Sequence, residues 1–469
     1  MSKIQLAIFS LGLLVGGCTL APKYKRPVAP VPAAWSSAAT AAAAHTPVHG
    51  TDEAPGWRDF FGDPRLQRLI ELALTNNRDL RIAALRVEQT RAQFRIQRSE
   101  LFPGVQGEGS LNRQKFSGAA TTFNGGNIIT TYSLSVGASY ELDLFGRVRS
   151  LKQAALDRYL ATEEARKSAQ MALVSEVASE YLTQLRLREA KAVAQQTLET
   201  VQASRDLIQS RFAVGAASEL ELRTAEGQVQ SVRVNAAGFL QLLAESENAL
   251  AVLIGGPVPN DLPAGQPFRE QRLLTQTPGE IPSNVLQRRP DILAAEHTLQ
   301  AAQGDIGAAR AAFFPRILLT GSAGTASASL GDLFSGPSAT WSFSPQIIVP
   351  IFDVGGTRAR LAATKIGGQI ELATYEKAIQ NAFREVANAL AVRVILEVKL
   401  QAQDALLRAL QSRFELTEAR YRQGVDSYVE VLLAQQELYA AQQNVLQYQV
   451  ARLLNDIALF RALGGGWKS

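Results

Sequence analysis

The chain has a single cysteine and only three histidines among its 469 residues. One thiol excludes an internal disulfide framework, and three imidazoles leave little from which to build a metal site. The sequence also lacks a G-x-S-x-G nucleophile elbow, a phosphate-binding glycine loop ahead of a helix, and an H-E-x-x-H pair. We therefore expect neither an enzyme nor a bound cofactor.

An excess of charge of one sign is also missing. The formal net charge is only +5, and Lys and Arg alternate with Asp and Glu along the chain, so a nucleic-acid partner is not expected. Hydrophobic residues make up 46% of the sequence and charged residues 19%, which excludes wholesale disorder. The composition predicts a folded protein with room for a large core.

Glycine and proline are absent from Leu151 to Val214, a run that closes on Gly215. Apolar side chains recur there three or four residues apart among Glu, Arg, Gln and Lys, which predicts one amphipathic helix about 100 Å long. A second such run extends from Gln369 to Gln423 and closes on Gly424. A compact domain needs no rods of this length, so the function has to account for two of them.

The first apolar segment, from Ile4 to Val15, follows Lys3 and is too short to cross a membrane as a helix. A basic residue, a short apolar stretch and small residues in this order are typical of a secretory signal peptide. We expect residues 1–17 to be that signal peptide.

The lone cysteine, Cys18, comes directly after this segment. The arrangement resembles the lipobox of diderm bacteria, in which diacylglycerol is attached to the thiol; an incidental cysteine in an ordinary signal peptide is the alternative. In such lipoproteins a residue that is not acidic at the next position, here Thr19, implies delivery to the outer membrane. Residues 18–56 are rich in Pro and Ala and are predicted to be an extended, lipid-anchored tether.

Two parts of the chain repeat each other. Residues 77–80 are matched by residues 289–292, which lie 212 positions later, and residues 211–215 are matched by residues 420–424 at an offset of 209. Near-constant offsets indicate an internal duplication. We assign residues 57–256 to the first repeat, 257–282 to a proline-rich linker, 283–465 to the second repeat and 466–469 to a C-terminal tail.

Each repeat is predicted to contain a helix, two strands, a long helix and a shorter helix. In the first repeat the helices that flank the strands and the rod are expected at Leu66–Leu101 and Ser218–Ile254. Tyr132–Leu142 alternates apolar and polar side chains over the length that a transmembrane strand requires, and Trp341–Val349 repeats the pattern. Their partners, Val105–Arg113 and Arg316–Thr325, are richer in Gly and Ser. A small, half-buried sheet in a soluble protein is the alternative interpretation.

Four strands cannot close a barrel, and an open edge in lipid leaves backbone N–H and C=O groups unpaired. Strands that span the membrane therefore require an oligomer, in which two, three or four copies would give barrels of 8, 12 or 16 strands. A duct wide enough for a solute favours more than 8, because the smallest barrels fill with side chains. The expected fold class is an α+β membrane protein whose strand barrel continues into a helical barrel.

The sequence resembles the TolC-like outer-membrane factors, and specifically their OprM-type efflux lipoproteins. The motifs that carry this resemblance are Trp57–Leu66, Glu141–Arg147, Arg288–Ile292, Ala308–Pro315 and Gly424–Tyr428. The resemblance implies a homotrimer with a 12-stranded outer-membrane β-barrel and a long periplasmic helical barrel. It also implies docking, through a periplasmic adaptor of the membrane-fusion type, onto an inner-membrane pump of the resistance-nodulation-division type.

The function that follows is an exit channel for drugs or toxic small solutes in the bacterial outer membrane. Two alternatives remain open at this point. One is a type I secretion channel, which passes unfolded polypeptide, and the other is a structural periplasmic coiled-coil adaptor, which has no membrane-spanning strands.

Candidate site residues cluster where the two rods end. Gly215 and Gly424 are predicted to turn the chain, because glycine suits the left-handed position after a helix. Ser218 with Glu221, and Ser427 with Glu430, each form an S-x-x-E capping box in sequence. Helix capping is one role for both glutamates; closing the periplasmic mouth of a duct is the other.

The resemblance assigns further roles to this region. In TolC-like proteins acidic residues just after the turn form constricting rings, and Glu430 falls on the first such position. The position three residues later is often Asp in these proteins and is Leu433 here. Leucine at that position indicates an apolar constriction that gates by dewetting. Tyr421 and Asp426 match positions of inter-helix latch contacts, although Asp426 alternatively helps to start its helix.

Overall fold

The structure, a computed structural model, describes residues 19–35, 56–115, 128–271, 273 and 283–465. The predicted signal peptide, Cys18 and the C-terminal tail 466–469 lie outside these residues, as do parts of the predicted tether and linker. The described chain forms two compact units, one built from residues up to Val28 with Arg86–Glu163 and Ala294–Tyr375, and the other from the remainder.

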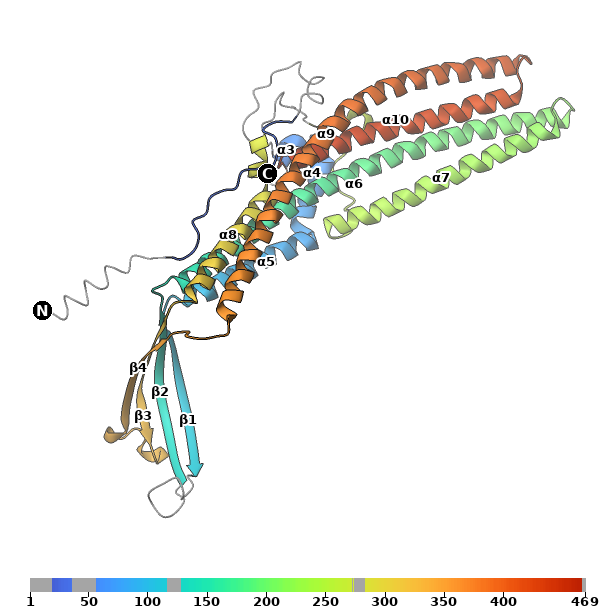
Figure 1. The fold of residues 1–469 in the computed structure, drawn as a ribbon. Helices are drawn as coiled ribbons and strands as arrows, with labels where there is room; N and C mark the ends of the chain where they lie inside the picture. The colour runs from blue at the N-terminus through green and yellow to red at the C-terminus, as the bar shows by residue number, and fades with distance from the viewer. Residues whose placement is uncertain (1–18, 36–55, 116–127, 272, 274–282, 466–469) are drawn as a thin grey trace. The chain divides into compact units, whose positions relative to one another are not determined.

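The first unit contains one four-stranded antiparallel sheet in the order β1-β2-β3-β4 (Figure 1). Its strands are β1 Gly104–Lys115, β2 Ile128–Leu142, β3 Arg316–Ser327 and β4 Ala339–Ile348. The four predicted strands are therefore confirmed, with ends that move by a few residues. The central pair, β2 with β3, joins the last strand of the first repeat to the first strand of the second.

The helices follow the same order in both repeats. They are α3 Trp57–Phe60, α4 Pro64–Asn76, α5 Arg78–Ser99, α6 Arg147–Ala213, α7 Glu219–Ile254, α8 Pro290–Ala311, α9 Gly356–Arg422 and α10 Tyr428–Ala462, with short 3-10 turns η1 Phe268–Glu270, η2 Ser283–Arg288, η3 Leu330–Asp332 and η4 Gly336–Ser338. Each repeat thus runs from helix through two strands into a long helix and a shorter one. The duplicated α+β architecture expected from the sequence is confirmed.

The second rod is longer than predicted. Helix α9 begins at Gly356 rather than Gln369, because Gly367 and Gly368 lie inside the helix instead of ending it. A Cβ atom at Gly368 would lie 3.1 Å from Cδ1 of Ile306 in α8. Glycine at this position lets α8 and α9 approach closely, so these two glycines serve packing and do not mark the start of the helix.

The single helix predicted over Leu66–Leu101 is wrong, because Asn77 breaks it into α4 and α5. The amide oxygen of Asn77 accepts a hydrogen bond from the Leu80 N–H at 2.9 Å, which caps α5. Its amide nitrogen donates to the Leu253 carbonyl at 2.9 Å, near the end of α7. One polar side chain therefore satisfies two helix ends at once, and a helical sequence pattern does not reveal that.

The core of the second unit gathers around α3, α4, α6 and α10. Phe60 and Phe460 stack with their ring centroids 4.0 Å apart. Beside them the buried carboxylate of Asp63 caps α4 and accepts hydrogen bonds from the Tyr181 hydroxyl at 2.9 Å and the Gln271 side-chain amide at 2.6 Å. Burial and the neighbouring carboxylate raise the pKa of Tyr181. This network holds the start of the inter-repeat linker on the helices.

Residues 19–35 are extended, as predicted for the tether, but they are held to the helices at several points. Tyr24 and Arg26 both donate to the Glu296 carboxylate of α8, each at 2.7 Å. Trp35 stacks on Phe383 with a centroid distance of 5.0 Å and donates its indole N–H to the Phe383 carbonyl. This part of the tether is therefore a docked segment, because Tyr24, Arg26 and Trp35 each find a partner on the helices.

Candidate functional site

The two faces of the sheet differ in polarity. Residues opposite one another in an antiparallel pair point to the same side of the sheet, so the register assigns every strand residue to a face. One face carries large apolar side chains that are exposed in the single chain, among them Leu134, Val136, Trp341, Phe343 and Ile347. This is the alternation that the sequence predicts for β2 and β4.

The opposite face is lined by small polar side chains. Ser110 and Ser133 hydrogen-bond across β1 and β2 at 2.7 Å, and Ser322 and Ser342 do so across β3 and β4 at 2.8 Å. The hydroxyl groups of each pair bond to one another, on a face of the sheet that has no buried core. The sheet can therefore separate an apolar phase from an aqueous one.

Both edges of this sheet are open. Among the described residues, β1 and β4 each pair with one strand only, which leaves a row of backbone N–H and C=O groups along the outer side of each. The edge strands are 12 and 10 residues long. Open edges of this length require a partner, above all in a low-dielectric phase.

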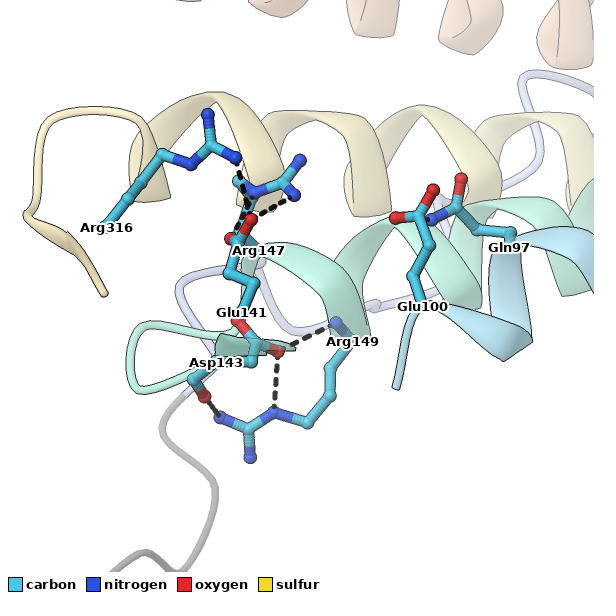
Figure 2. A network of polar contacts seen from close by, with 7 residues as sticks. All are labelled: Gln97, Glu100, Glu141, Asp143, Arg147, Arg149 and Arg316. Carbon is cyan, nitrogen blue, oxygen red and sulfur yellow. Dashed lines mark hydrogen bonds and ion pairs between the residues drawn. The ribbon is translucent and has the colours of Figure 1, made fainter. Parts of the chain in front are cut away.

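An ionic network joins the strands to the helices (Figure 2). Glu141, at the end of β2, accepts two hydrogen bonds from Arg147 at 2.7 and 2.8 Å and one from Arg316 of β3 at 2.8 Å. The hydrogen bonds that Arg147 donates to Glu141 raise the pKa of Arg147 above its ordinary value. Next to it Asp143 accepts from the backbone N–H of Arg149 at 2.9 Å.

This network fixes the corner between β2, β3 and α6 with charge-assisted hydrogen bonds. The sequence motif Glu141–Arg147 was part of the resemblance above, but its pairing with Arg316 was not predicted. Glu141 and Arg147 lie six residues apart on either side of a turn, so their pairing could be predicted from the local sequence. Arg316 lies 175 residues from Glu141, and nothing in the sequence indicated that it would join them.

The rods end in two tip turns, residues 214–218 and 423–427. Gly215 and Gly424 have φ angles of 75° and 77°, in the left-handed region. In each turn the glycine N–H and the following N–H bond back to carbonyls of the last helical turn, at 2.8 to 3.0 Å. This is the Schellman arrangement, and it reverses the chain from α6 into α7 and from α9 into α10 (Figure 1).

The two tip turns are closed differently. At the first, Ser218 and Glu221 form the predicted capping box, with the Ser218 N–H donating to the Glu221 carboxylate at 2.8 Å. At the second, the predicted box is wrong, because the Ser427 side chain makes no capping hydrogen bond. Arg420 instead binds Asp426 through two hydrogen bonds, at 2.7 and 2.9 Å, which ties the end of α9 to the turn.

A small core joins the two tips. Tyr421 and Tyr428 lie with ring centroids 5.8 Å apart, and the Arg211 guanidinium lies over the Tyr421 ring at 5.3 Å. Ile208 and Leu222 from the first hairpin complete the cluster. The Tyr428 hydroxyl is buried without a hydrogen-bond partner, and burial raises its pKa to about 12.

Glu430 and Leu433 lie on one face of α10, because residues three apart are neighbours on a helix. Both side chains are exposed in the single chain. Among the described residues the Glu430 carboxylate has no hydrogen bond or ion pair, whereas its counterpart Glu221 is used in capping. The second hairpin thus presents an acid and a leucine that its own turn does not use.

Other binding chemistry is sparse. Over the described ranges no group of three or more His, Cys, Asp or Glu side chains is placed to hold a metal ion. A cavity of about 150 Å³ in the second unit is lined mainly by polar residues, including Arg269, Glu397, Asp404 and Arg452. It is smaller than the roughly 300 Å³ at which drug-sized sites begin.

A two-faced sheet with open edges, attached to long helical hairpins that end in packed tip turns, defines an outer-membrane channel protein. The profile of the family described as outer membrane efflux protein matches residues 69–256 and 281–465. The chain belongs to this family, which confirms the predicted resemblance and the predicted class of function.

Individual relatives agree. The chain is 44% identical to the toluene efflux pump outer membrane protein TtgC of Pseudomonas putida, over 100% of this chain and 96% of that one. It is 40% identical to the cation efflux system protein CusC of Escherichia coli, over the whole of both chains. The crystal structure of the open state of the MtrE outer membrane channel of Neisseria gonorrhoeae has a TM-score of 0.86 and 38% identity, and covers 96% of this chain and 99% of that one.

Proposed function

We propose that the chain is the exit duct of a tripartite efflux system and passes drugs or toxic small solutes out of the periplasm. Three copies close one barrel in the outer membrane, and their helices extend into the periplasm towards an adaptor and a proton-driven inner-membrane pump of the resistance-nodulation-division type. The duct provides a path and carries out no reaction. The observation that supports this most strongly is the sheet, with one apolar face, one polar face and two open edges.

Three copies of a four-stranded sheet give twelve strands, which is within the range of closed outer-membrane barrels. In such a barrel the apolar face lies against lipid and the serine-rich face lines a water-filled interior. Strands of 10 to 15 residues are long enough to cross the apolar core of the bilayer. Barrels of more than eight strands leave room for a solute.

Helix α7 supports the trimer rather than a helical membrane span. Of the helices in the described part of the chain, it is the one long and apolar enough to cross a membrane. Its apolar side chains Val234, Leu240 and Val252 are exposed in the single chain, but Arg223 and its ion pairs with Glu219 and Glu226 lie on the same helix. The ion pairs lie in the first turns of α7 and these exposed apolar side chains lie further along it, so a neighbouring copy can cover the apolar part while the charges stay in water.

The closed state of the duct is set, in this proposal, by Glu430 and Leu433. Three copies would form an acidic ring next to an apolar ring, and a narrow apolar ring excludes water. The Arg420–Asp426 ion pair and the Tyr421 cluster hold the second tip turn in place. Glu221 caps its helix and contributes through the rigidity of the first turn.

The anchor is a separate part of the proposal. Cys18, outside the described residues, carries the lipid, and the docked segment that follows it starts at Thr19, whose hydroxyl hydrogen-bonds with that of Ser150 at 3.2 Å. Several acyl chains would give firm attachment to the outer membrane.

The test is to express the full chain in an outer membrane and to examine the purified protein. We expect trimers that resist SDS until heated, outer-membrane fractionation that survives a high-salt wash, and channel conductance in planar bilayers. A strain that lacks its own exit channel should regain resistance to efflux substrates. Release by salt and no heat-dependent shift on the gel would contradict the proposal and favour the periplasmic adaptor.

A further inference from the structure

We propose a specific register for the contact that closes the barrel: β4 of one copy pairs antiparallel with β1 of a second copy, with Gln346 opposite Ser110 and Ile347 opposite Gly109. The inference rests on the proposed function, since it needs neighbouring copies in one sheet. It goes further by naming the residue pairs on each face of the contact.

The first step is that the two hairpins of the sheet are equivalent. In β1 and β2, Gly104 lies opposite Ser139, and in β3 and β4, Arg316 lies opposite Ile348. Arg316 is 212 positions after Gly104, and Ile348 is 209 positions after Ser139. These are the offsets that relate the two repeats in sequence, so the duplication preserves the register of the hairpin.

The second step uses the contact between the hairpins. Within one chain β2 pairs with β3, and Gly137 lies opposite Ser322. Strand β4 is the repeat of β2, and β1 is the repeat of β3. The open edge of β4 is therefore equivalent to the edge with which β2 contacts β3. The open edge of β1 is likewise equivalent to the edge with which β3 contacts β2. Gln346 of β4 is the equivalent of Gly137, 209 positions later, and Ser110 of β1 is the equivalent of Ser322, 212 positions earlier. The contact between copies should therefore place Gln346 opposite Ser110.

The transferred register agrees with the polarity of both faces at the centre of the contact. It places Gln346 and Ser110 on the polar face, and Ile347 and Gly109 on the apolar face. Further along it places Arg113 and Lys115 opposite Phe343 and Trp341 on the apolar face, and Glu108 opposite Ile348 on the polar face. A slip by one residue would put polar side chains among apolar ones along the whole seam. The apolar pair is also complementary in size, because Ile347 is 66% exposed in the single chain and would lie over a residue without a side chain.

The base of the seam differs from its counterpart inside the chain. The residue equivalent to Glu141 in the second repeat is Pro350, and the residue equivalent to Arg316 in the first repeat is Gly104. The ionic network of Figure 2 therefore has no equivalent between copies. In its place the register brings Ile351 opposite Val105, side chains that are 94% and 68% exposed in the single chain. The base of the contact between β4 and β1 of two copies is therefore apolar, whereas the base of the contact between β2 and β3 within a chain is ionic.

Engineered disulfides test the register in the full-length protein in outer membranes. In the double variant Gln346→Cys with Ser110→Cys, directly opposite residues bring their Cα atoms to about 4.5–5.5 Å, which a disulfide can span. Within one chain two strands separate β1 from β4, about 14 Å at the usual strand spacing, so an internal bond is excluded. Copper-phenanthroline oxidation should give covalent trimers on a non-reducing gel. Each single-cysteine variant should give none.

Matched controls shift the register by two residues on the same face. Gln346→Cys with Asn112→Cys, or with Glu108→Cys, places the thiols on diagonal positions, beyond the roughly 7 Å limit of a disulfide. The variant Ile347→Cys with Gly109→Cys tests the same register on the apolar face, in case the first pair prevents insertion.

The outcomes separate the register from the function. Cross-linking of a shifted pair, in a protein that still forms conducting, heat-modifiable trimers, would show that the register is wrong and leave the exit duct intact. Such trimers without cross-linking in any pair would overturn the pairing of β4 with β1. A monomeric protein without conductance would contradict the proposed function itself.

Discussion

Arg420 and Asp426 form a two-pronged ion pair across the second tip turn, with N–O distances of 2.7 and 2.9 Å. The first turn has an arginine at the equivalent position, Arg211, but Ala217 stands where the aspartate would be. Arg211 lies over Tyr421 instead. The duplicated turns have therefore diverged, and the second hairpin has an ionic closure of its own.

We expect Asp426→Asn to loosen the second tip turn and to raise the closed-state conductance in planar bilayers. Glu219→Gln, which removes an exposed partner of Arg223 at the first tip, is the matched control and should leave the conductance unchanged. Equal effects of the two substitutions would show that the Arg420–Asp426 pair has no special role.

The same pair predicts a pH dependence. The hydrogen bond from Arg420 lowers the pKa of Asp426, so the stabilisation is fully present above the ordinary aspartate value of 3.8 and is lost as the pH falls through the lowered pKa. Closed-state conductance should stay constant from about pH 7 to about pH 4 and rise only below that range. A rise that Asp426→Asn does not remove would point to another group.

Substitutions at the proposed rings test the gate. Leu433→Thr introduces the residue that the first repeat has at the equivalent position, Thr224, and should wet the apolar ring and raise the closed-state conductance. Glu430→Gln keeps the size of the side chain but removes the acidic ring, and should reduce the preference for cations. If both variants close as tightly as the parent, these two residues do not set the aperture.

The buried Tyr428 hydroxyl has no hydrogen-bond partner, so Tyr428→Phe should be neutral or stabilising by up to about 1 kcal/mol, as measured by thermal unfolding in detergent. Tyr428→Ala should cost about 3–5 kcal/mol through the cavity that it leaves. Because burial raises the pKa from 10.0 to about 12, the parent should lose stability at the tip as the pH rises through that interval. Tyr428→Phe should not show this loss.

Two side chains at equivalent positions of the repeats each bind the end of a helix. Asn77 donates to the Leu253 carbonyl at 2.9 Å, and the buried Arg289 donates to the Ala462 carbonyl at 2.7 Å and also pairs with Glu385. Each substitution should cost about 1–3 kcal/mol of unfolding free energy. Arg289→Ala should cost the more of the two, because it also removes a charged donor from Asp291 and Glu385, whose side chains are about a third exposed. Denaturant titration followed by circular dichroism measures both, and a larger loss for Asn77→Ala would contradict the comparison.

Cys18→Ser should abolish metabolic labelling with palmitate and weaken retention in the outer membrane. The barrel should still assemble if the strands alone span the bilayer, so heat-modifiable trimers serve as the control. Labelling that persists in this variant would place the acyl chain at another residue.

Much of the fold could be predicted from local periodicity. The rod that ends at Gly215, the alternation in β2 and the offsets between the repeats are all properties of short stretches of sequence, since helix and strand each repeat over a few residues. The break at Asn77 and the start of α9 ahead of Gly367 were missed. Each has a local cap, from Asn77 to the Leu80 N–H and from Asp353 to the Thr357 N–H. Each also has a contact distant in sequence that a local pattern does not reveal, with the Leu253 carbonyl and the Ile306 side chain respectively.

The candidate site divides in the same way. The sequence determined that two glycine turns end the rods and that Glu430 and Leu433 follow the second of them. The capping box of Ser218 and Glu221 could also be predicted, and it forms. Only the tertiary structure decided that the second predicted box does not form, that Asp426 is held by Arg420, and that Glu141 joins β2 to β3 through Arg316. Periodicity fixes which side of an element faces inward, but hydrogen bonds and ion pairs form only between groups that the fold brings within about 3 Å of each other.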